Sequence, residues 1–185
     1  MRVLGISGSL RRDSHNRRLL AAAAHELPDG VEFTAWTGLA GIPPYDEDLD
    51  VERAPGAVAQ MRTALTHTDA ILIATPEYNH SLPGQLKNAL DWASRPFPGN
   101  SLRGKPAAVV GASTSMFGAV WAQAELRRVL KAAGAHVVEE ELGVPSAHEA
   151  FDDGGDLRDP AQREALVAVV AQLLDAAAAP LQRVA

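Results

Sequence analysis

The feature that most limits how this chain can fold is a strict alternation of short apolar runs with longer amphipathic segments. Runs of strand length are predicted at residues 2–6, 31–36, 70–74, 107–112 and 135–138. Segments of helical character follow them at residues 16–26, 54–66, 83–93, 120–133 and 160–178. Strands that alternate with helices form a parallel sheet covered on both sides. The sequence therefore predicts an α/β fold, a doubly wound five-stranded parallel sheet with helices on both faces.

The composition of the chain excludes several functional classes. The 185 residues predict a single domain spanning residues 1–185. A net charge of −6 argues against a nucleic-acid surface, which needs a basic face. The absence of cysteine excludes disulfides, thiolate nucleophiles and cysteine-ligated metals. No apolar run approaches the roughly 20 residues of a membrane span, and the N-terminal segment lacks a secretory layout. We therefore expect a cytoplasmic protein that does not bind membranes.

Three loops follow predicted strands and should form the binding site, namely residues 7–15, 75–82 and 113–118. In a doubly wound sheet, ligands bind beyond the carboxyl ends of the strands, where the winding direction reverses. Two other connections, residues 37–53 and 139–158, are long for a compact domain. Loops of that length often serve function or assembly.

The first loop, Gly-Ser-Leu-Arg-Arg-Asp-Ser-His-Asn, has the composition of an anion site. It only approaches the Gly-x-Ser-x-Gly nucleophile elbow, because Ser9 stands where the second glycine belongs. Neither the Gly-x-Gly-x-x-Gly fingerprint nor the Walker motif is present. Ser9, Arg11, Ser14 and Asn16 surround the predicted helix start, where free amides favour anions. The alternative is that Asp13 or Ser14 only caps the helix and the arginines are solvated.

The absence of the Walker lysine limits the kind of phosphate ligand that we expect at this loop. A cradle without it suits the single phosphate of a retained cofactor, such as FMN, better than a triphosphate to be cleaved. The second loop, Thr-Pro-Glu-Tyr-Asn-His-Ser-Leu-Pro, is stiffened by Pro76 and Pro83 and suits a flat heterocycle. For Tyr78 and His80, ordinary surface or interface packing is the alternative.

Together the stretches "GSLRRDSHN" and "PEYNHSLPGQLKNALDW" resemble the NADPH-dependent FMN reductase family of flavodoxin-like proteins, which includes chromate and quinone reductases. The resemblance runs from about residue 1 to residue 160. It implies a flavodoxin-like fold in which the first loop holds the FMN phosphate through Ser9, Arg11, Ser14 and Asn16. The second loop would hold the ribityl chain and ring through Pro76, Glu77, Tyr78 and Asn79. The third would border the flavin through Ser113, Thr114 and Ser115.

The resemblance also implies the reaction. NADPH or NADH would pass hydride to bound FMN, and electrons would then go to an acceptor such as a quinone, chromate, an azo compound or a flavin. The flavin carries this chemistry, so no catalytic side chain and no metal are expected. A flavodoxin-type electron carrier without NAD(P)H activity is the main alternative. An FMN-free regulatory or scaffold protein is a further one.

Two further expectations follow from the resemblance. Related reductases pair subunits beside the flavin, so a homodimer or homotetramer is expected. Candidate contacts are Trp92, Phe97 and Phe117, and the alternative for each is a place in the core. The third loop departs from close relatives, because Phe117 precedes a single glycine, Gly118, where a Gly-Gly pair is common. This departure leaves the path of that loop open.

Overall fold

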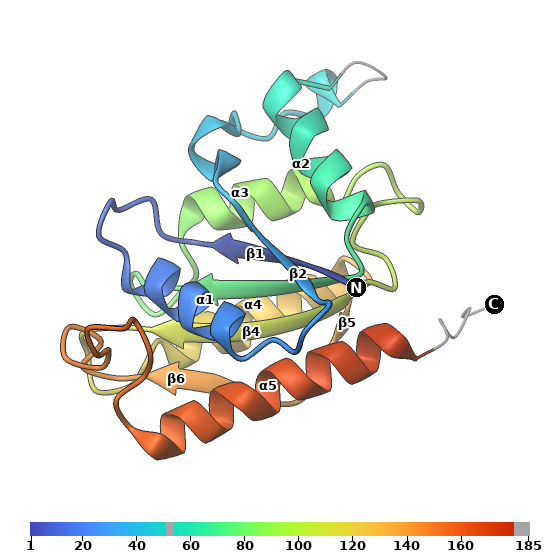
Figure 1. Ribbon diagram of the computed structural model, residues 1–185. Helices are drawn as coiled ribbons and strands as arrows, with labels where there is room; N and C mark the ends of the chain where they lie inside the picture. The colour runs from blue at the N-terminus through green and yellow to red at the C-terminus, as the bar shows by residue number, and fades with distance from the viewer. Residues whose placement is uncertain (51–53, 180–185) are drawn as a thin grey trace.

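The computed structural model describes residues 1–50 and 54–179 and shows one sheet between two layers of helices (Figure 1). The strands are β1 (Arg2–Ser7), β2 (Glu32–Trp36), β3 (Ala70–Thr75), β4 (Pro106–Ala112), β5 (His136–Val137) and β6 (Leu142–Val144). The helices are α1 (His15–His25), α2 (Gly56–Thr66), α3 (Gly84–Ala93), α4 (Val120–Ala132) and α5 (Pro160–Ala178). Two short 3-10 helices, η1 (Gly38–Gly41) and η2 (Glu47–Leu49), follow β2.

The sheet is parallel throughout, with strand order β2-β1-β3-β4-β5 and β6 paired to β4. The chain moves outward from β1 to β2 and then crosses back to β3 on the other side of β1. The winding direction therefore reverses between β1 and β3, which opens a crevice at their carboxyl ends. This arrangement confirms the predicted doubly wound α/β fold.

Each face of the sheet has its own apolar core. On one face, Leu4 and Ile6 of β1 pack with apolar side chains of α2, α3 and α4. On the other face, Val3 packs with α1 and α5 (Figure 1). Strands buried on both sides read as continuous apolar runs, and β3 and β4 are buried along their whole length. Trp92 is fully buried in the first core, so of its two predicted alternatives, core residue or subunit contact, the structure supports the core.

Beyond β4 the sheet continues as two short strands, and only β5 falls within the strand predicted at residues 135–138. β5 pairs with the start of β4 and β6 with its end. Between them the Arg127 guanidinium donates hydrogen bonds to the carbonyls of Val138 at 2.7 Å and Glu139 at 3.1 Å. These carbonyls thus have partners without pairing to β4. The prediction of a loop over residues 139–158 is therefore wrong for residues 142–144.

The other long connection packs against α3. Gln85 donates from Nε2 to the carbonyl oxygens of Leu39 and Ile42, both at 2.8 Å. Asn88 accepts from the Tyr45 amide at 2.7 Å. Residues 51–53, the end of this predicted connection, lie outside the described residues, as do residues 180–185 of the predicted single domain. Among the described helices, none is long and apolar enough to cross a membrane.

Candidate functional site

The three loops after β1, β3 and β4 meet around a cavity of about 130 Å³. Two of the eleven predicted site residues, Asn79 and Ser115, do not line it. The other nine do, and they are Ser9, Arg11, Ser14, Asn16, Pro76, Glu77, Tyr78, Ser113 and Thr114. The loops lie at residues 7–15, 75–82 and 113–118, at least 31 positions apart in the sequence, yet parallel strands bring their carboxyl ends to one edge. The structure therefore supports the predicted location of the site, while the binding roles remain predictions.

The first loop presents unused hydrogen-bond donors to the cavity. Ser14 is the N-cap of α1, and its hydroxyl accepts from the Arg17 amide at 3.3 Å. Capping at that position leaves the amides of His15 and Asn16, in the first turn, without intrahelical partners. The helix dipole adds positive potential at the same point. Ser14 thus caps the helix, as the alternative had it, and still lies in the cavity wall.

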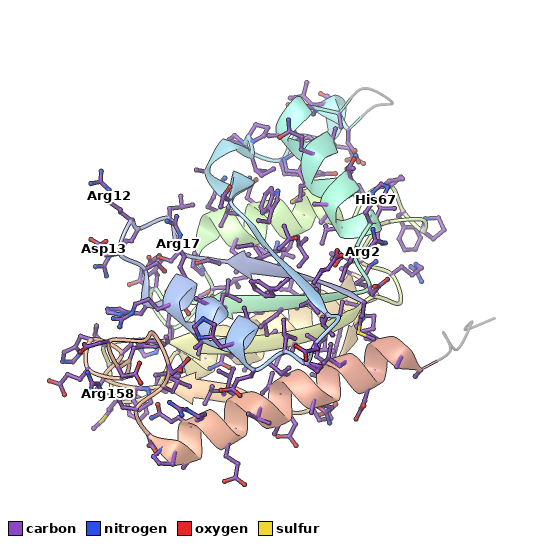
Figure 2. All side chains as sticks on the ribbon, in the orientation of Figure 1. Arg2, Arg12, Asp13, Arg17, His67 and Arg158 are labelled. Carbon is purple, nitrogen blue, oxygen red and sulfur yellow. The ribbon has the colours of Figure 1, made fainter. Side chains whose placement is uncertain are left out.

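The two arginines of this loop have different surroundings. Arg11 lines the cavity. Arg12 and Asp13 project from the tip of the loop, away from the body of the protein (Figure 2). Asp13 does not cap α1, because Ser14 does. Of these two arginines, Arg11 is therefore the one placed to contact an anion in this cavity.

Asn16 joins the first loop to the third. Its side chain is almost fully buried and makes a reciprocal pair with the backbone of Ala112, donating from Nδ2 at 2.9 Å and accepting at Oδ1 from the amide at 3.0 Å. The predicted role of Asn16 was to donate to a phosphate. The structure gives its amide another task, which is to hold the end of β4 against the start of α1.

The second loop is a tight hairpin turn. Tyr78 and Ser81 exchange two backbone hydrogen bonds of 3.0 and 3.1 Å. Between them, Asn79 and His80 both have positive φ, at 54° and 59°. Two left-handed central residues define the type I′ turn, for which asparagine is favoured. Asn79 therefore forms the turn that presents Tyr78 and does not line the cavity.

Glu77 links the second loop to α4. Its Oε2 accepts hydrogen bonds from the amides of Trp121 at 3.0 Å and Ala122 at 3.1 Å. The N-cap of α4, Ala119, has no side chain able to cap these amides. The carboxylate supplies that cap, and its charge complements the helix dipole. Glu77 lines the cavity, as predicted, but its carboxylate binds the protein.

In the third loop, two consecutive residues have left-handed backbone conformations, and only the first of them is a glycine. A Cβ on Gly118 would lie 2.5 Å from the Gly143 carbonyl carbon, and its φ is +57°. Glycine is therefore required at 118. The next residue, Ala119, also has a left-handed φ of 63° and is fully buried. Alanine thus occupies the second left-handed position, at a conformational cost of about 1–2 kcal/mol.

His15 also lines the cavity, although it was not among the predicted site residues. Its Nδ1 atom is buried without a hydrogen-bond partner. Burial, followed by the charges of Arg11, Arg18 and His148, holds the pKa of His15 below its ordinary value. The imidazole is therefore neutral near pH 7. Its position between Ser14 and Asn16, two predicted site residues, is the sequence feature that could have predicted it.

Comparisons with known proteins decide the family. Residues 1–149 match the sequence model of the NADPH-dependent FMN reductases. The chain belongs to this family. An NAD(P)H-dependent FMN reductase of Pseudomonas aeruginosa is 45% identical over 165 residues, covering 89% of this chain and 88% of that protein. A 2-hydroxy-1,4-benzoquinone reductase of a Burkholderia species is 41% identical, covering 70% and 69%.

A solved structure agrees with this assignment. The flavoenzyme NAD(P)H:(acceptor) oxidoreductase FerB of Paracoccus denitrificans superposes with a TM-score of 0.86 at 36% identity, over 95% of this chain and 96% of that one. The prediction of an NAD(P)H-dependent FMN oxidoreductase is thereby confirmed. The electron-carrier and FMN-free alternatives are set aside.

The cavity of this FMN reductase fits the phosphate end of its cofactor. Sites that enclose a small molecule usually measure roughly 300–1,000 Å³, so 130 Å³ cannot hold a whole FMN. The free amides of α1, the Ser9 and Ser14 hydroxyls and the Arg11 guanidinium match a phosphate group. The unpartnered His15 Nδ1 is a further polar atom available in this wall.

The described residues hold no cluster of histidine and carboxylate side chains suited to a metal. The acidic run at residues 139–141 instead faces basic side chains. Glu139 and Glu141 lie 3.9 Å from Arg127, and Glu139 lies 3.7 Å from Lys131. Glu139 and Glu141 therefore pair with basic side chains of α4.

Proposed function

We propose that this FMN reductase passes electrons from NAD(P)H to small quinones through an open site. The support is twofold. Relatives at 34–41% identity are named quinone or benzoquinone reductases. The cavity, in turn, encloses too little volume to hide more than the phosphate end of FMN. When bound, FMN supplies the chemistry of accepting a hydride and releasing its electrons.

The protein's part in this reaction is to bind and orient. Arg11, Ser9 and Ser14 would hold the phosphate together with the first amides of α1. Pro76 and Tyr78 would border the remainder of the cofactor, because they line the same cavity from the second loop. Asn16 and Glu77 would keep the three loops in register through their bonds to Ala112 and to α4. No side chain is assigned to proton or hydride transfer.

Exposed aromatic side chains lie next to this cavity. Tyr78 is 49% exposed, Phe117 53% and Trp121 41%. The Trp121 ring makes edge contacts with Phe117 at 5.0 Å and with His80 at 4.7 Å between ring centroids. Flat apolar rings of this kind suit the stacking of nicotinamide and quinone rings. A shallow aromatic surface would accept acceptors of varied shape.

We further propose that a second copy of the chain covers part of this surface. Met116 and Val120 extend the aromatic group and are 75% and 42% exposed. Contiguous exposed apolar side chains mark interaction sites. Phe97, the other predicted contact, is 71% exposed but lies between α3 and β4, toward the amino ends of the strands. Sedimentation would test the pairing. The wild type should be a dimer or larger, and a double variant that carries both Phe117→Glu and Trp121→Glu should be a monomer.

The reaction itself is tested with the purified, FMN-loaded protein. Mixed anaerobically with NADPH or NADH, it should lose the visible absorbance of oxidised flavin. A small quinone should then restore that absorbance, and steady-state plots should give the parallel lines of a ping-pong cycle. Failure of both nicotinamides to bleach the protein would contradict the proposal. We place the enzyme in the cytoplasm, where NAD(P)H is supplied by metabolism.

A further inference from the structure

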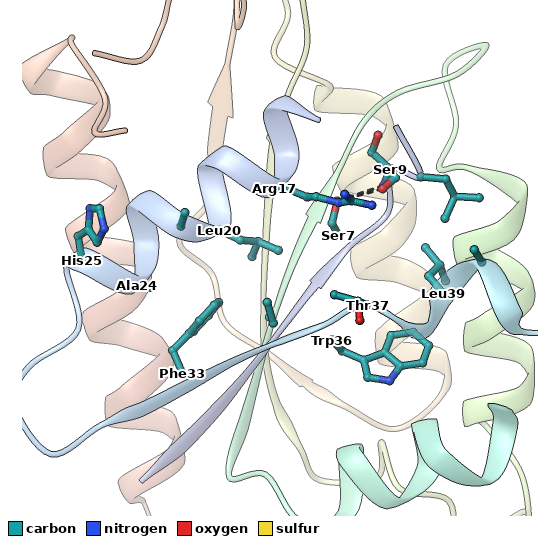
Figure 3. Close-up of a pocket in the computed structure, with 15 residues that line it drawn as sticks. Ser7, Ser9, Arg17, Leu20, Ala24, His25, Phe33, Trp36, Thr37 and Leu39 are labelled. Atoms are coloured by element: carbon teal, nitrogen blue, oxygen red, sulfur yellow. Dashed lines mark hydrogen bonds between the residues drawn. The ribbon is translucent and has the colours of Figure 1, made fainter. Parts of the chain in front are cut away.

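A second cavity, of about 360 Å³, lies between α1 and the edge strand β2 (Figure 3). Residues of β1, α1, β2 and η1 line it. It has only Ser9 in common with the candidate FMN cavity, so the first loop separates the two. Nothing in the reductase reaction described above uses this second cavity.

The hollow results from small residues on facing elements. α1 packs mainly on β1, β3 and β4 and covers β2 less closely. The side of α1 toward β2 presents Ala21 and Ala24. Gly5 adds no side chain from the sheet, and the Phe33 ring lies over it, since a Cβ there would come within 2.3 Å of the ring. Space of this size remains because no large side chain from α1 fills it.

The walls are aromatic and aliphatic. The Phe33 ring lies on the α1 side of β2, and Leu20 and Leu39 contribute apolar surface (Figure 3). Trp36 borders the cavity at the end of β2, with its ring toward the other face of the sheet. The Trp36 ring packs on Gly38, where a Cβ would lie 2.7 Å from the indole. The planar ring of Phe33 favours a planar aromatic ligand.

One end of the cavity carries a positive charge. The Arg17 side chain extends beside Ser7 and Ser9 at that end (Figure 3). Within residues 1–50 and 54–179, the Arg17 guanidinium forms no ion pair. At the other end, His25 is paired with Asp156 at 2.8 Å, so that end offers no free charge. The charge distribution suits a ligand with an anionic group at one end.

We propose that this second cavity binds a small planar aromatic acid, with its ring between Phe33 and α1 and its acid group on Arg17. A volume of 360 Å³ lies near the lower limit for small-molecule sites, which favours a compound of one or two rings over a dinucleotide. Arginine binds a carboxylate through two parallel hydrogen bonds, and the hydroxyls of Ser7 and Ser9 lie at the same end.

The test uses 2-naphthoate and the FMN-loaded protein. Calorimetry should show saturable binding that added FMN does not displace. Arg17→Met should weaken it about 10- to 100-fold, as expected when a charge-assisted contact is lost. Arg12→Met, which removes the same charge at the loop tip, should leave it unchanged. Ala24→Leu should also weaken binding, by filling the cavity, and uncharged 2-naphthamide should bind wild type and Arg17→Met equally.

The three tryptophans report where the ligand binds. Trp36 lines the second cavity, Trp92 lies in the core, and Trp121 lies beside the candidate FMN site. In a spectrum of the indole N–H groups, 2-naphthoate should shift the resonance of Trp36. A shift of Trp121 instead, no shift at millimolar ligand, or unchanged binding by Arg17→Met would each overturn the proposal. A change of oligomeric state in Ala24→Leu would do so too, because it would assign this face to a second copy.

Discussion

The carboxylate of Glu77, in the loop after β3, caps the helix that begins beside Trp121. One oxygen, Oε2, accepts from the Trp121 amide at 3.0 Å and from the next amide at 3.1 Å. Ser81 adds a second link, since its hydroxyl donates to Glu125 of α4 at 2.5 Å. The second loop is thereby fastened to α4 at two points on either side of the Asn79–His80 turn. The position of Tyr78 at the cavity follows from this attachment.

Removal of that cap should loosen the site. We expect Glu77→Ala to lower the free energy of unfolding by about 0.5–2 kcal/mol, because two amides lose their acceptor. FMN should also bind more weakly, since Tyr78 would be less well positioned. Glu77→Gln keeps an acceptor oxygen but not the charge, so its stability and its FMN affinity should lie between those of the wild type and Glu77→Ala. Denaturant unfolding and FMN titration measure both effects. Glu164→Ala, at an exposed position of α5, is the matched control and should change neither quantity.

The elements of the fold were predictable because strand and helix patterns are local. Helix α3 was predicted within one residue at its start, and β3 within one residue at its end. The second short strand, β6, was not predicted, since the break between β5 and β6 depends on the Arg127 guanidinium reaching carbonyls 11 and 12 positions away. Apolar periodicity carries no information on such side-chain contacts.

The location of the candidate site could be predicted from the sequence, but the roles of its individual side chains could be predicted less well. Its residues follow strand ends, so topology alone brings nine of them to one cavity. The tasks of Asn16 and Glu77 depend on partners 96 and 44 positions away, at Ala112 and Trp121. Residue type suggested donors and acceptors at both positions. Only the structure shows that the protein itself uses them.

Arg11 and Arg12 provide a direct test of the phosphate cradle. Arg11 lines the cavity, whereas Arg12 points away from it (Figure 2). Arg11→Ala should weaken FMN binding by about 10- to 150-fold, the equivalent of roughly 1.5–3 kcal/mol for charge-assisted hydrogen bonds. Arg12→Ala should change it by much less. Riboflavin, which has no phosphate, should bind the wild type and Arg11→Ala with similar affinity. Equal FMN binding by all three proteins would place the phosphate elsewhere.

Gly118 should tolerate no side chain. Gly118→Ala places a methyl group against the Gly143 and Val144 backbone and imposes a left-handed φ on alanine. Strain and overpacking together should lower the free energy of unfolding by about 2–4 kcal/mol. Gly84→Ala, at the start of α3 where an added Cβ meets nothing within 4 Å, should be neutral or slightly stabilising. Thermal unfolding measures the stabilities of the two variants. Equal stability of Gly118→Ala and Gly84→Ala would disprove the tight approach of the third loop to β6.

His15 should make stability and FMN binding depend on pH in opposite directions. Its pKa in the folded protein lies below the ordinary value of 6.5, first because of burial and then because of Arg11, Arg18 and His148. The unfolded chain therefore binds the proton more readily. The stability that the neutral imidazole contributes is complete above about pH 6.5 and is lost as the pH falls through the lower folded pKa.

A phosphate in the cavity reverses the electrostatic balance at His15. Its negative charge favours the protonated imidazole, so binding should take up a proton, and the contribution of His15 to FMN affinity should grow as the pH falls. Phosphate monoesters themselves lose charge near pH 6, which weakens binding by every variant. His15→Phe separates the two effects, because it keeps the phosphate titration and removes the imidazole. Between pH 7.5 and 5.5 the ratio of wild-type to His15→Phe affinity should rise by about three- to tenfold. Over the same range the FMN-free wild type should lose more thermal stability than the variant. An affinity ratio that does not change with pH would show that His15 does not contact the phosphate.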